Sequence, residues 1–385
     1  MQYEDILSKM SLEEKCSILT GKDVWHTREF PGAEVPSIML SDGPSGLRKQ
    51  EGEGDHLGLN ASVKATCFPS AATVANTWDP ELAERVGEAL GREAAAKEVG
   101  VLLGPGLNVK RSPLCGRNFE YFSEDPYLAG KMAAAYVRGI QSQGISACPK
   151  HFAANAQEMH RMANDSEVDE RTLRELYLTN FEIAIGEGKP RTIMTSYNQV
   201  NGTYAHENHH LLSDVLRGEW DYHGVVVSDW GGCNDIVESA REGANLEMPG
   251  TGNDSPIQLY EAVKAGRISE KEIDERVHEL LTLVFAVANA GEPSVDMEAQ
   301  HEIAVEAARK AVVLLKNEGD ILPLKKDAKI ALIGDFAETP RYQGAGSSLV
   351  NSYKVLNTTD LIRSEFPNAE NYMPGFTRED RWEIG

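Results

Sequence analysis

Short apolar runs alternate with stretches of helical periodicity from about residue 36 to about residue 290. Apolar runs of four or five residues, rich in β-branched side chains, are typical of buried strands in a parallel sheet. The segments that we expect to be strands are residues 37–41, 101–104, 145–148, 192–196, 225–228 and 244–248. Between them, apolar residues recur every three or four positions, which predicts helices over residues 80–98, 127–143, 170–186 and 255–265.

This alternation predicts an α/β fold, a (β/α) barrel of the TIM type, because each strand is followed by a helix that can cover a parallel sheet. Six strand ends are visible, whereas a full barrel has eight. The irregular stretch 68–75 is a candidate for a seventh strand. A distorted or incomplete barrel therefore stays open as an alternative.

The remainder of the chain predicts a second domain. A helix expected over residues 269–290 is followed by Gly291, Glu292, Pro293 and Ser294, a composition typical of a linker. Beyond it, a helix over 298–312 leads to expected strands at 313–316 and 330–334, like the start of a doubly wound α/β sheet. We assign residues 1–290 to the barrel, 291–300 to the linker and 301–385 to a partial α/β sandwich domain that is incomplete at its C-terminus.

The composition limits the classes of partner. A chain of 385 residues, 41% of them hydrophobic, can bury a sizeable core. Its formal net charge of -22 disfavours nucleic acid and anionic membranes as partners, because both are bound through an excess of Lys and Arg. We expect a cytoplasmic protein that acts on a small molecule, since the N-terminus lacks a basic and apolar leader and no run approaches a membrane span. A homo-oligomer stays open.

The sequence implies no metal and no organic cofactor. The five cysteines lack C-x-x-C spacing, and the histidines of segment 206–210 lack the spacing of a zinc helix. A phosphate-binding loop and a strand-linked G-x-G-x-x-G motif are also missing from the sequence. Nucleotide binding and zinc chemistry therefore lose their usual support.

The most informative segment is the apolar run Val225, Val226 and Val227, which ends in Ser228, Asp229 and Trp230. In α/β barrels the catalytic groups lie at the carboxyl ends of the strands. Asp229 is therefore a candidate nucleophile or base, and Trp230 a candidate platform for the apolar face of a ligand. The alternative is that Asp229 caps the following helix.

Other expected strands end in polar residues as well: Asp42 in a turn with glycines and Pro44, Lys150 beside His151, and Tyr197. Taken singly, Asp42 could be a turn cap, His151 a core histidine and Tyr197 a packing residue. Together with Arg117 and Arg161, they would give one edge of the barrel many charged hydrogen-bonding groups. Such a set suits a ligand with many hydroxyl groups, so a sugar is the favoured ligand.

The motifs resemble, in the same order, those of glycoside hydrolase family 3, and most closely those of its β-glucosidases. They cover residues 10–348 approximately and comprise S-D-G-P-x-G at 41–46, G-R-N-F-E at 116–120, P-K-H-F at 149–152, T-S-Y-N at 195–198, V-S-D-W at 227–230 and E-M-P-G at 247–250. The resemblance implies that Asp229 is the catalytic nucleophile and that Trp230 flanks the entrance. It implies that the terminal sugar is held by Asp42, Arg117, Lys150, His151, Arg161 and Tyr197, and that the loop containing Ser347 completes the pocket.

Retaining hydrolysis of a glycoside needs a nucleophilic carboxylate and an acid about 5–5.5 Å apart. In the β-glucosidases that this chain resembles, the acid is a glutamate of the second domain beyond the loop that matches Ser347. We expect that glutamate to be absent from the 385 residues. A family branch acting on N-acetylglucosaminides uses a histidine in K-H-F-P-G-H-G instead, but this chain has Lys150, His151, Phe152 and then Ala153, Ala154 and Asn155.

The leading interpretation is a retaining exo-β-glucosidase that forms a covalent glycosyl-enzyme at Asp229. A β-xylosidase or another exo-β-glycosidase is the alternative within the class, and a sugar-binding protein without turnover is the alternative outside it. A barrel lyase with Lys150 as a Schiff base is less favoured, because that chemistry needs a desolvated lysine and this one is expected among carboxylates. A further expectation is that an exposed sheet edge in the second domain favours self-association.

Overall fold

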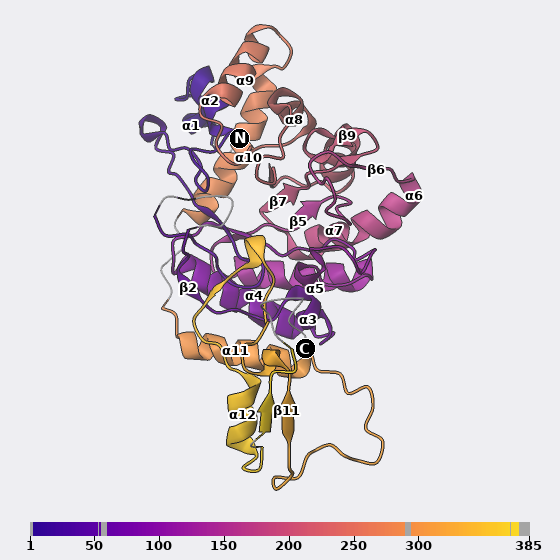
Figure 1. The fold of residues 1–385 in the computed structure, drawn as a ribbon. Coiled ribbons are helices and arrows are strands. Elements are labelled where there is room, and N and C mark those ends of the chain that lie inside the picture. The colour runs from indigo at the N-terminus through magenta and orange to yellow at the C-terminus, as the bar shows by residue number, and fades with distance from the viewer. Residues whose placement is uncertain (1–2, 53, 55–59, 289–293, 370, 377–385) are drawn as a thin grey trace.

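A computed structural model describes residues 3–52, 54, 60–288, 294–369 and 371–376 of the chain (Figure 1). The strands are β1 (Leu40–Asp42), β2 (Lys64–Ala65), β3 (Val101–Leu103), β4 (Ser146–Ala147), β5 (Lys150–Phe152), β6 (Asp165–Ser166), β7 (Thr192–Thr195), β8 (Gln199–Val200), β9 (Thr203–Tyr204), β10 (Val225–Val227), β11 (Ala331–Ile333), β12 (Asn351–Ser352) and β13 (Asn371–Met373).

The α-helices are α1 (Glu4–Leu7), α2 (Leu12–Ile18), α3 (Ala71–Ala75), α4 (Pro80–Ala95), α5 (Pro126–Gln141), α6 (Glu170–Thr172), α7 (Thr179–Ile183), α8 (Ile236–Glu242), α9 (Asp254–Lys264), α10 (Glu270–Val287), α11 (Met297–Lys310) and α12 (Thr358–Glu365). Short 3₁₀ turns are η1 (Pro31–Ala33), η2 (Asn118–Glu120), η5 (Ala205–Glu207), η7 (Asp335–Ala337) and η8 (Gly346–Ser348), and π-helical turns are η3 (Leu173–Leu178), η4 (Ala184–Gly188) and η6 (His210–Glu219). Among the described residues, no helix combines the length and the apolar composition that a membrane crossing needs.

The first domain is a distorted (β/α) barrel, as the sequence predicts. Its parallel strands pair in the orders β1–β3–β4 and β10–β7–β5. The segment from β4 to β5 joins the two groups, because it bonds to residues 104–107 on one side and to β7 on the other. The expected strand at 244–248 makes only isolated bridges, Leu246 to Val227 and Glu247 to Thr20, so the barrel continues through irregular backbone.

Two expectations about the barrel strands are corrected. Residues 71–75 of the candidate seventh strand form helix α3, which Ser70 caps by accepting a hydrogen bond from the Thr73 backbone N–H. The sequence pattern does not predict β5 as a separate strand, because only two residues, Cys148 and Pro149, separate it from β4. Its register against β7 shifts between Lys150 and Phe152. Lys150 and His151 are therefore part of a strand rather than of the loop after one.

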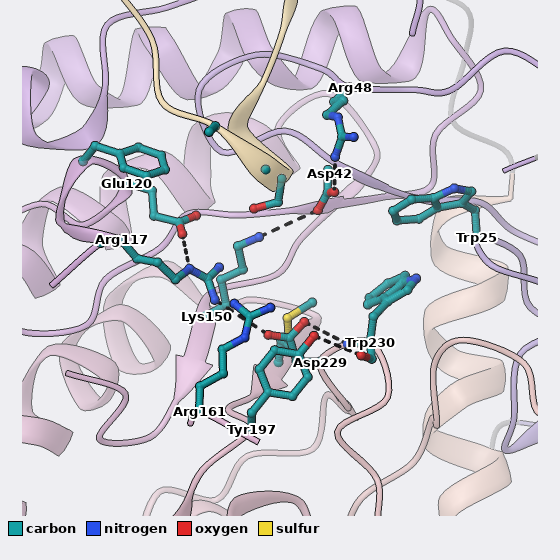
Figure 2. A pocket seen from close by; sticks show the side chains of 16 residues that line it. Trp25, Asp42, Arg48, Arg117, Glu120, Lys150, Arg161, Tyr197, Asp229 and Trp230 are labelled. Atoms are coloured by element: carbon teal, nitrogen blue, oxygen red, sulfur yellow. Dashed lines mark hydrogen bonds and ion pairs between the residues drawn. The ribbon is translucent and has the colours of Figure 1, made fainter. Parts of the chain in front are cut away.

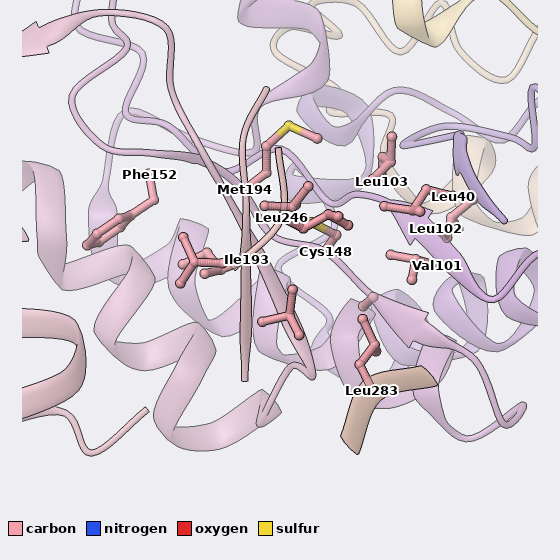
Figure 3. Packing of buried hydrophobic residues seen from close by; sticks show 14 of the residues in the cluster. Leu40, Val101, Leu102, Leu103, Cys148, Phe152, Ile193, Met194, Leu246 and Leu283 are labelled. Atoms are coloured by element: carbon pink, nitrogen blue, oxygen red, sulfur yellow. The ribbon is translucent and has the colours of Figure 1, made fainter. Parts of the chain in front are cut away.

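Aliphatic side chains fill the barrel. Leu40, Leu102, Ile193 and Leu246 are fully buried (Figure 3), and so is Val226. Burial of one such side chain contributes about 1.5–3 kcal/mol to folding. Because the strand bodies are committed to this core, the polar groups that follow them are left at one rim of the barrel.

After the barrel, α11 packs on α4. The helix starts at Met297, inside the expected linker 291–300, because Asp296 caps it through the backbone N–H groups of Glu298 and Ala299. Residues 289–293 of that linker lie outside the described residues. The strand expected at 330–334 is present as β11 and pairs in parallel with β13, but residues 313–316 form no strand. Figure 1 shows β11 and α12 at the far end of the molecule from α9.

Candidate active site

A cavity of about 330 Å³ lies at the rim where β1, β7 and β10 end, beside Lys150 at the start of β5. That volume is at the small end of the range of about 300–1,000 Å³ usual for ligand sites. Figure 2 shows its side chains pointing toward one another from several strands. The cavity is lined by Trp25, Asp42, Arg48, Gly116, Arg117, Phe119, Glu120, Lys150, Arg161, Met194, Tyr197, Asp229, Trp230, Ala345, Gly346 and Ser347.

Asp229 stands two residues after the end of β10 and is fixed by its own turn. Its Oδ1 accepts a hydrogen bond from the Trp230 backbone N–H at 2.8 Å, and its carbonyl oxygen accepts one from the Gly232 N–H at 2.7 Å. Gly231 at the turn has φ +81°, a left-handed conformation that favours glycine. Asp229 as a whole residue is 9% exposed, and its side chain lines the cavity. The turn therefore holds one oxygen and leaves Oδ2 to its neighbours in the site.

Arg117 supplies the cation nearest to that oxygen. Its Nη1 lies 3.9 Å from Asp229 Oδ2, its Nε is bonded to Glu120, and its Nη2 donates to His151 Nε2 at 2.7 Å. Burial opposes the charge of Arg117, but the pKa of the guanidinium is raised well above its usual value by Glu120, Tyr121 and Asp229. Lys150 and Arg161 are paired with other carboxylates, those of Asp42 and Glu158 respectively.

His151 lies beneath the cavity and does not line it. The side chain is 1% exposed, with Nε2 3.5 Å from Asp229 Oδ2 and Nδ1 3.0 Å from the Tyr121 hydroxyl. Burial, together with the positive charges of Arg117 and Lys150, holds its pKa well below the usual value. Because Nε2 accepts the hydrogen of Arg117, the neutral ring orients the guanidinium. His151 is not among the residues that line the cavity, and its contact with a sugar stays a prediction.

Asp42 and Lys150 form the other charged end of the cavity. The Asp42 carboxylate lies 3.2 Å from Arg48 Nη1 and 3.9 Å from Lys150 Nζ. Burial raises the pKa of Asp42, while Lys150 and Arg48 oppose that rise. A carboxylate and an ammonium side by side can accept from and donate to neighbouring hydroxyl groups of one ligand.

Glu120 belongs to the G-R-N-F-E motif at 116–120, but it is not among the residues that the sequence analysis predicts to bind the sugar. It is fully buried, and its Oε2 has no hydrogen-bond partner among the described residues. Burial would raise its pKa, but Arg117 and Lys150 outweigh that effect and lower it, so the group stays ionised. An ionised oxygen without a partner at a cavity wall is an acceptor available to a ligand hydroxyl.

Aromatic rings form one wall of the cavity. The Trp25 and Trp230 rings are 5.1 Å apart and inclined at 40°, and the Trp230 indole N–H donates to the Val24 carbonyl at 2.7 Å. The Arg161 guanidinium also lines the cavity and stacks 4.7 Å above the Tyr197 ring. The Tyr197 hydroxyl donates to the Trp230 carbonyl at 2.9 Å, which ties the end of β7 to the turn that carries Asp229.

The sequence analysis predicted eight of the sixteen residues that line the cavity. The predicted residues that do line the cavity are Asp42, Arg117, Lys150, Arg161, Tyr197, Asp229, Trp230 and Ser347. Arg48 could have been found, since it follows the rigid turn 42–46. Trp25 could not be predicted from the residues around it. It reaches the rim only because the barrel closes near Thr20, which bridges to Glu247.

The arrangement suits a neutral, polyhydroxylated ligand that lies beside the Asp229 carboxylate. Charged donors and acceptors at the walls match hydroxyl groups, and the tryptophans offer a flat apolar surface. Within the described residues, no group of three or more His, Cys, Asp and Glu side chains is arranged to hold a metal ion.

Comparison with known families gives two matches. The model described as the glycosyl hydrolase family 3 N terminal domain matches residues 53–283, and the one described as the family 3 C-terminal domain matches residues 312–381. Among curated relatives, thermostable beta-glucosidase B of Acetivibrio thermocellus is 49% identical over 384 residues, which are 99% of this chain and 51% of that protein. The exo-alpha-(1->6)-L-arabinopyranosidase of Bifidobacterium breve is 44% identical, over 96% of this chain and 50% of that protein.

Solved structures give the same fold. The crystal structure of the Bifidobacterium adolescentis GH3 beta-glucosidase superposes with a TM-score of 0.89 at 43% identity, covering 96% of this chain and 53% of the other. Beta-glucosidase 3B of Thermotoga neapolitana in complex with glucose gives a TM-score of 0.89 at 38% identity, covering 97% and 55%. The chain spans about half the length of the curated relatives it matches.

Proposed function

The chain belongs to glycoside hydrolase family 3, and we propose that it carries the sugar-binding and nucleophilic part of a retaining exo-β-glucosidase. The substrate is a terminal β-D-glucosyl residue, and Asp229 is the nucleophile. The observation that carries the proposal is the Asp229 carboxylate at the wall of a small polar cavity at the carboxyl ends of barrel strands.

In the proposed reaction, the Asp229 carboxylate attacks the anomeric carbon and the aglycone oxygen leaves with the bonding electrons. Water then cleaves the glycosyl ester, so the configuration is retained. Arg117 places a positive charge beside the attacking carboxylate, with Nη1 3.9 Å from Asp229 Oδ2. His151 is neutral, so it adds no second positive charge beside Asp229.

Sugar binding is proposed to use both ends of the cavity. Asp42 and Lys150 face adjacent hydroxyl groups at the closed end, and the free Oε2 of Glu120 accepts another hydroxyl from the side. Trp230 flanks the entrance, where an aglycone can rest against its ring. The small cavity and its charged end favour removal of one terminal residue over cleavage within a long chain.

The proton donor for the leaving group is proposed to lie outside the described lining of the cavity. Within that lining, the carboxyl groups other than Asp229 are Asp42 and Glu120, and each faces cations. General acid catalysis contributes about 10²- to 10⁴-fold in rate. The 385-residue chain should therefore cleave dinitrophenyl glucoside, whose leaving group needs no proton, far better than an alkyl glucoside. Equal acceleration of both substrates would contradict this.

A mechanism-based label tests the central claim. Incubation with 2-deoxy-2-fluoro-β-glucosyl fluoride should add one fluoroglucosyl group, located at Asp229 by peptide mass spectrometry. Asp229→Ala should take up no label, whereas Asp221→Asn should label like the unchanged chain, because Asp221 lies on the surface. A label on another carboxylate would overturn the assignment, and no label at all would favour a sugar-binding protein without turnover.

One relative, at 44% identity, is an arabinopyranosidase, so the sugar that the site accepts has to be tested as well. We propose glucose because a hydroxymethyl-bearing sugar uses the donors and acceptors at the Asp42 end more fully than a pentose does. Rates on the nitrophenyl derivatives of β-glucose, β-xylose and α-L-arabinopyranose rank the candidates. A higher kcat/KM on either pentoside would replace glucose as the proposed substrate.

A further inference from the structure

The loop 344–348 reaches the cavity from outside the barrel, and its stem is fixed there by main-chain pairing. Strand β12 pairs in parallel with β2, with Asn351 opposite Lys64 and Ser352 opposite Ala65. The Asn351 side chain also donates to the Ser62 carbonyl at 2.8 Å. In Figure 1 the yellow segment that contains β12 extends from the region of α12 up to the barrel.

The side chain of Gln343 closes the base of this loop. Its Oε1 accepts the Val350 backbone N–H at 2.8 Å, and its Nε2 donates to the Val350 carbonyl at 3.1 Å. Val350 is buried against Gly46, where any added side chain would collide with Thr66 and Val350. The position of the loop relative to the turn after β1 is therefore closely constrained.

At its first residue, Gly344, the loop rests on Phe119. A Cβ atom at Gly344 would fall well inside van der Waals contact with the Phe119 ring. The ring thus packs directly against the backbone, and the next residues, Ala345, Gly346 and Ser347, form the lip of the cavity.

Phe119 is also part of the turn that holds the charged groups under the ligand. It lies in η2, between Arg117 and Glu120, which are bonded to each other. Arg117 in turn faces Asp229 and bonds to His151. A shift of the ring therefore moves the loop on one side and the guanidinium on the other.

We propose that Phe119 is a positioning residue that sets the distance between the lip 345–347 and the Arg117–Glu120 pair. At position 344, glycine is the only residue type that lets the Phe119 ring and the loop meet at the observed separation. Every other residue type would place a Cβ atom inside the ring. This inference rests on the proposed function, since the lip and the pair are taken as two walls of one sugar site.

A double-mutant cycle on glucose binding tests the contact. The dissociation constant for D-glucose is measured by tryptophan fluorescence, since Trp25 and Trp230 line the cavity. Displacement of a site wall by about 1 Å can cost up to about 100-fold. Gly344→Ala should therefore weaken binding about 10- to 100-fold in the otherwise unchanged chain. In a Phe119→Ala background it should cost no more than about 2-fold, because removal of the ring leaves room for the methyl group.

Gly186→Ala serves as the control, because nothing lies within 4 Å of a Cβ atom there and the residue is remote from the cavity. Thermal unfolding of all variants verifies that they are folded. Equal costs of Gly344→Ala in both backgrounds, or no cost in either, would overturn the proposal. Failure of fluoroglucoside labelling in the unchanged chain would instead overturn the proposed function, so the two failures are distinguishable.

Discussion

At the scale of single residues, the site is organised around one guanidinium that serves three acceptors. Arg117 contacts Glu120, His151 and Asp229 with different nitrogens of its planar fork. A lysine, with one compact charge, cannot reproduce these directions. The orientation of the proposed nucleophile therefore depends on a residue that does not itself react.

We expect Arg117→Lys to lower kcat/KM on dinitrophenyl glucoside by about 10²- to 10³-fold, as loss of one preorganised donor commonly does. The rate is measured under steady-state conditions, together with the rate of fluoroglucoside labelling. Arg171→Lys is the matched control, because Arg171 is an exposed helix residue paired with Glu175. An Arg117→Lys variant as active as this control would show that the guanidinium geometry is dispensable.

A second residue-scale prediction concerns His206, a histidine buried without charge. Its Nδ1 lies 2.8 Å from the Thr195 hydroxyl, Nε2 has no partner among the described residues, and burial lowers the pKa of His206 to about 3. In the unfolded chain a histidine has a pKa of about 6.5. Protons therefore bind the unfolded state first, and stability is lost as the pH falls below about 6.5 toward the folded value.

Between pH 7 and pH 5 this single group should cost about 2 kcal/mol of unfolding free energy. We expect His206→Gln to be less stable than the unchanged chain at pH 7 but to lose about 2 kcal/mol less on going to pH 5, measured by urea denaturation. His223→Gln, whose side chain is 75% exposed, is the control and should follow the unchanged chain. A pH profile of His206→Gln that parallels the unchanged chain would contradict the assignment.

At the scale of elements, a buried amide helps to hold α11 on the barrel. Gln300 of α11 donates through Nε2 to the Ala89 carbonyl of α4 at 2.7 Å and to Glu93 Oε1 at 3.1 Å. The other oxygen of Glu93 accepts the Thr66 backbone N–H at 2.9 Å, next to β2. The same network thus links α11, α4 and the strand that holds the pocket loop.

We expect Gln300→Ala to destabilise the protein by about 1–3 kcal/mol, because it leaves a buried carboxylate oxygen and a carbonyl without their donor. Thermal or urea unfolding measures the loss. Glu302→Ala, on the exposed face of the same helix, should change stability by less than about 0.5 kcal/mol. Equal stability of the two variants would show that the amide does not hold α11 in place.

At the scale of the whole molecule, buried and exposed apolar residues are unevenly divided. The barrel buries its strands, whereas β11 and β13 present apolar side chains to solvent, with Ile333 74% and Met373 63% exposed. Leu315, before them in the chain, is 91% exposed. Contiguous apolar surface and an open strand edge favour association with another polypeptide.

We expect the 385-residue chain to self-associate as its concentration rises, despite its net charge of -22. Sedimentation velocity over a 50-fold concentration range measures this. The pair Ile333→Glu and Met373→Glu should return the chain toward the monomer, while Val305→Glu on α11 should not. A single monomeric species at every concentration would contradict the prediction.

The sequence by itself determined the features that depend on neighbouring residues in the chain, namely the order of strands and helices and the polar residues at the strand ends. The alternation of apolar runs and amphipathic helices predicted the barrel, and strand ends such as Ser228–Asp229 identified the groups at its rim, because a strand buried on both faces leaves polar residues only beyond its end. The motifs predicted the family, which the family models confirm. The same reasoning supplied half of the residues that line the cavity.

Only the tertiary structure decided which of these groups face one another. His151 and Arg117 come from different segments, and nothing local shows that the imidazole lies beneath the guanidinium. Trp25 reaches the rim through closure of the barrel, and Phe119 meets Gly344 through packing between domains. Such contacts join residues far apart in the chain, so their geometry follows from how the elements pack and not from any short stretch of sequence.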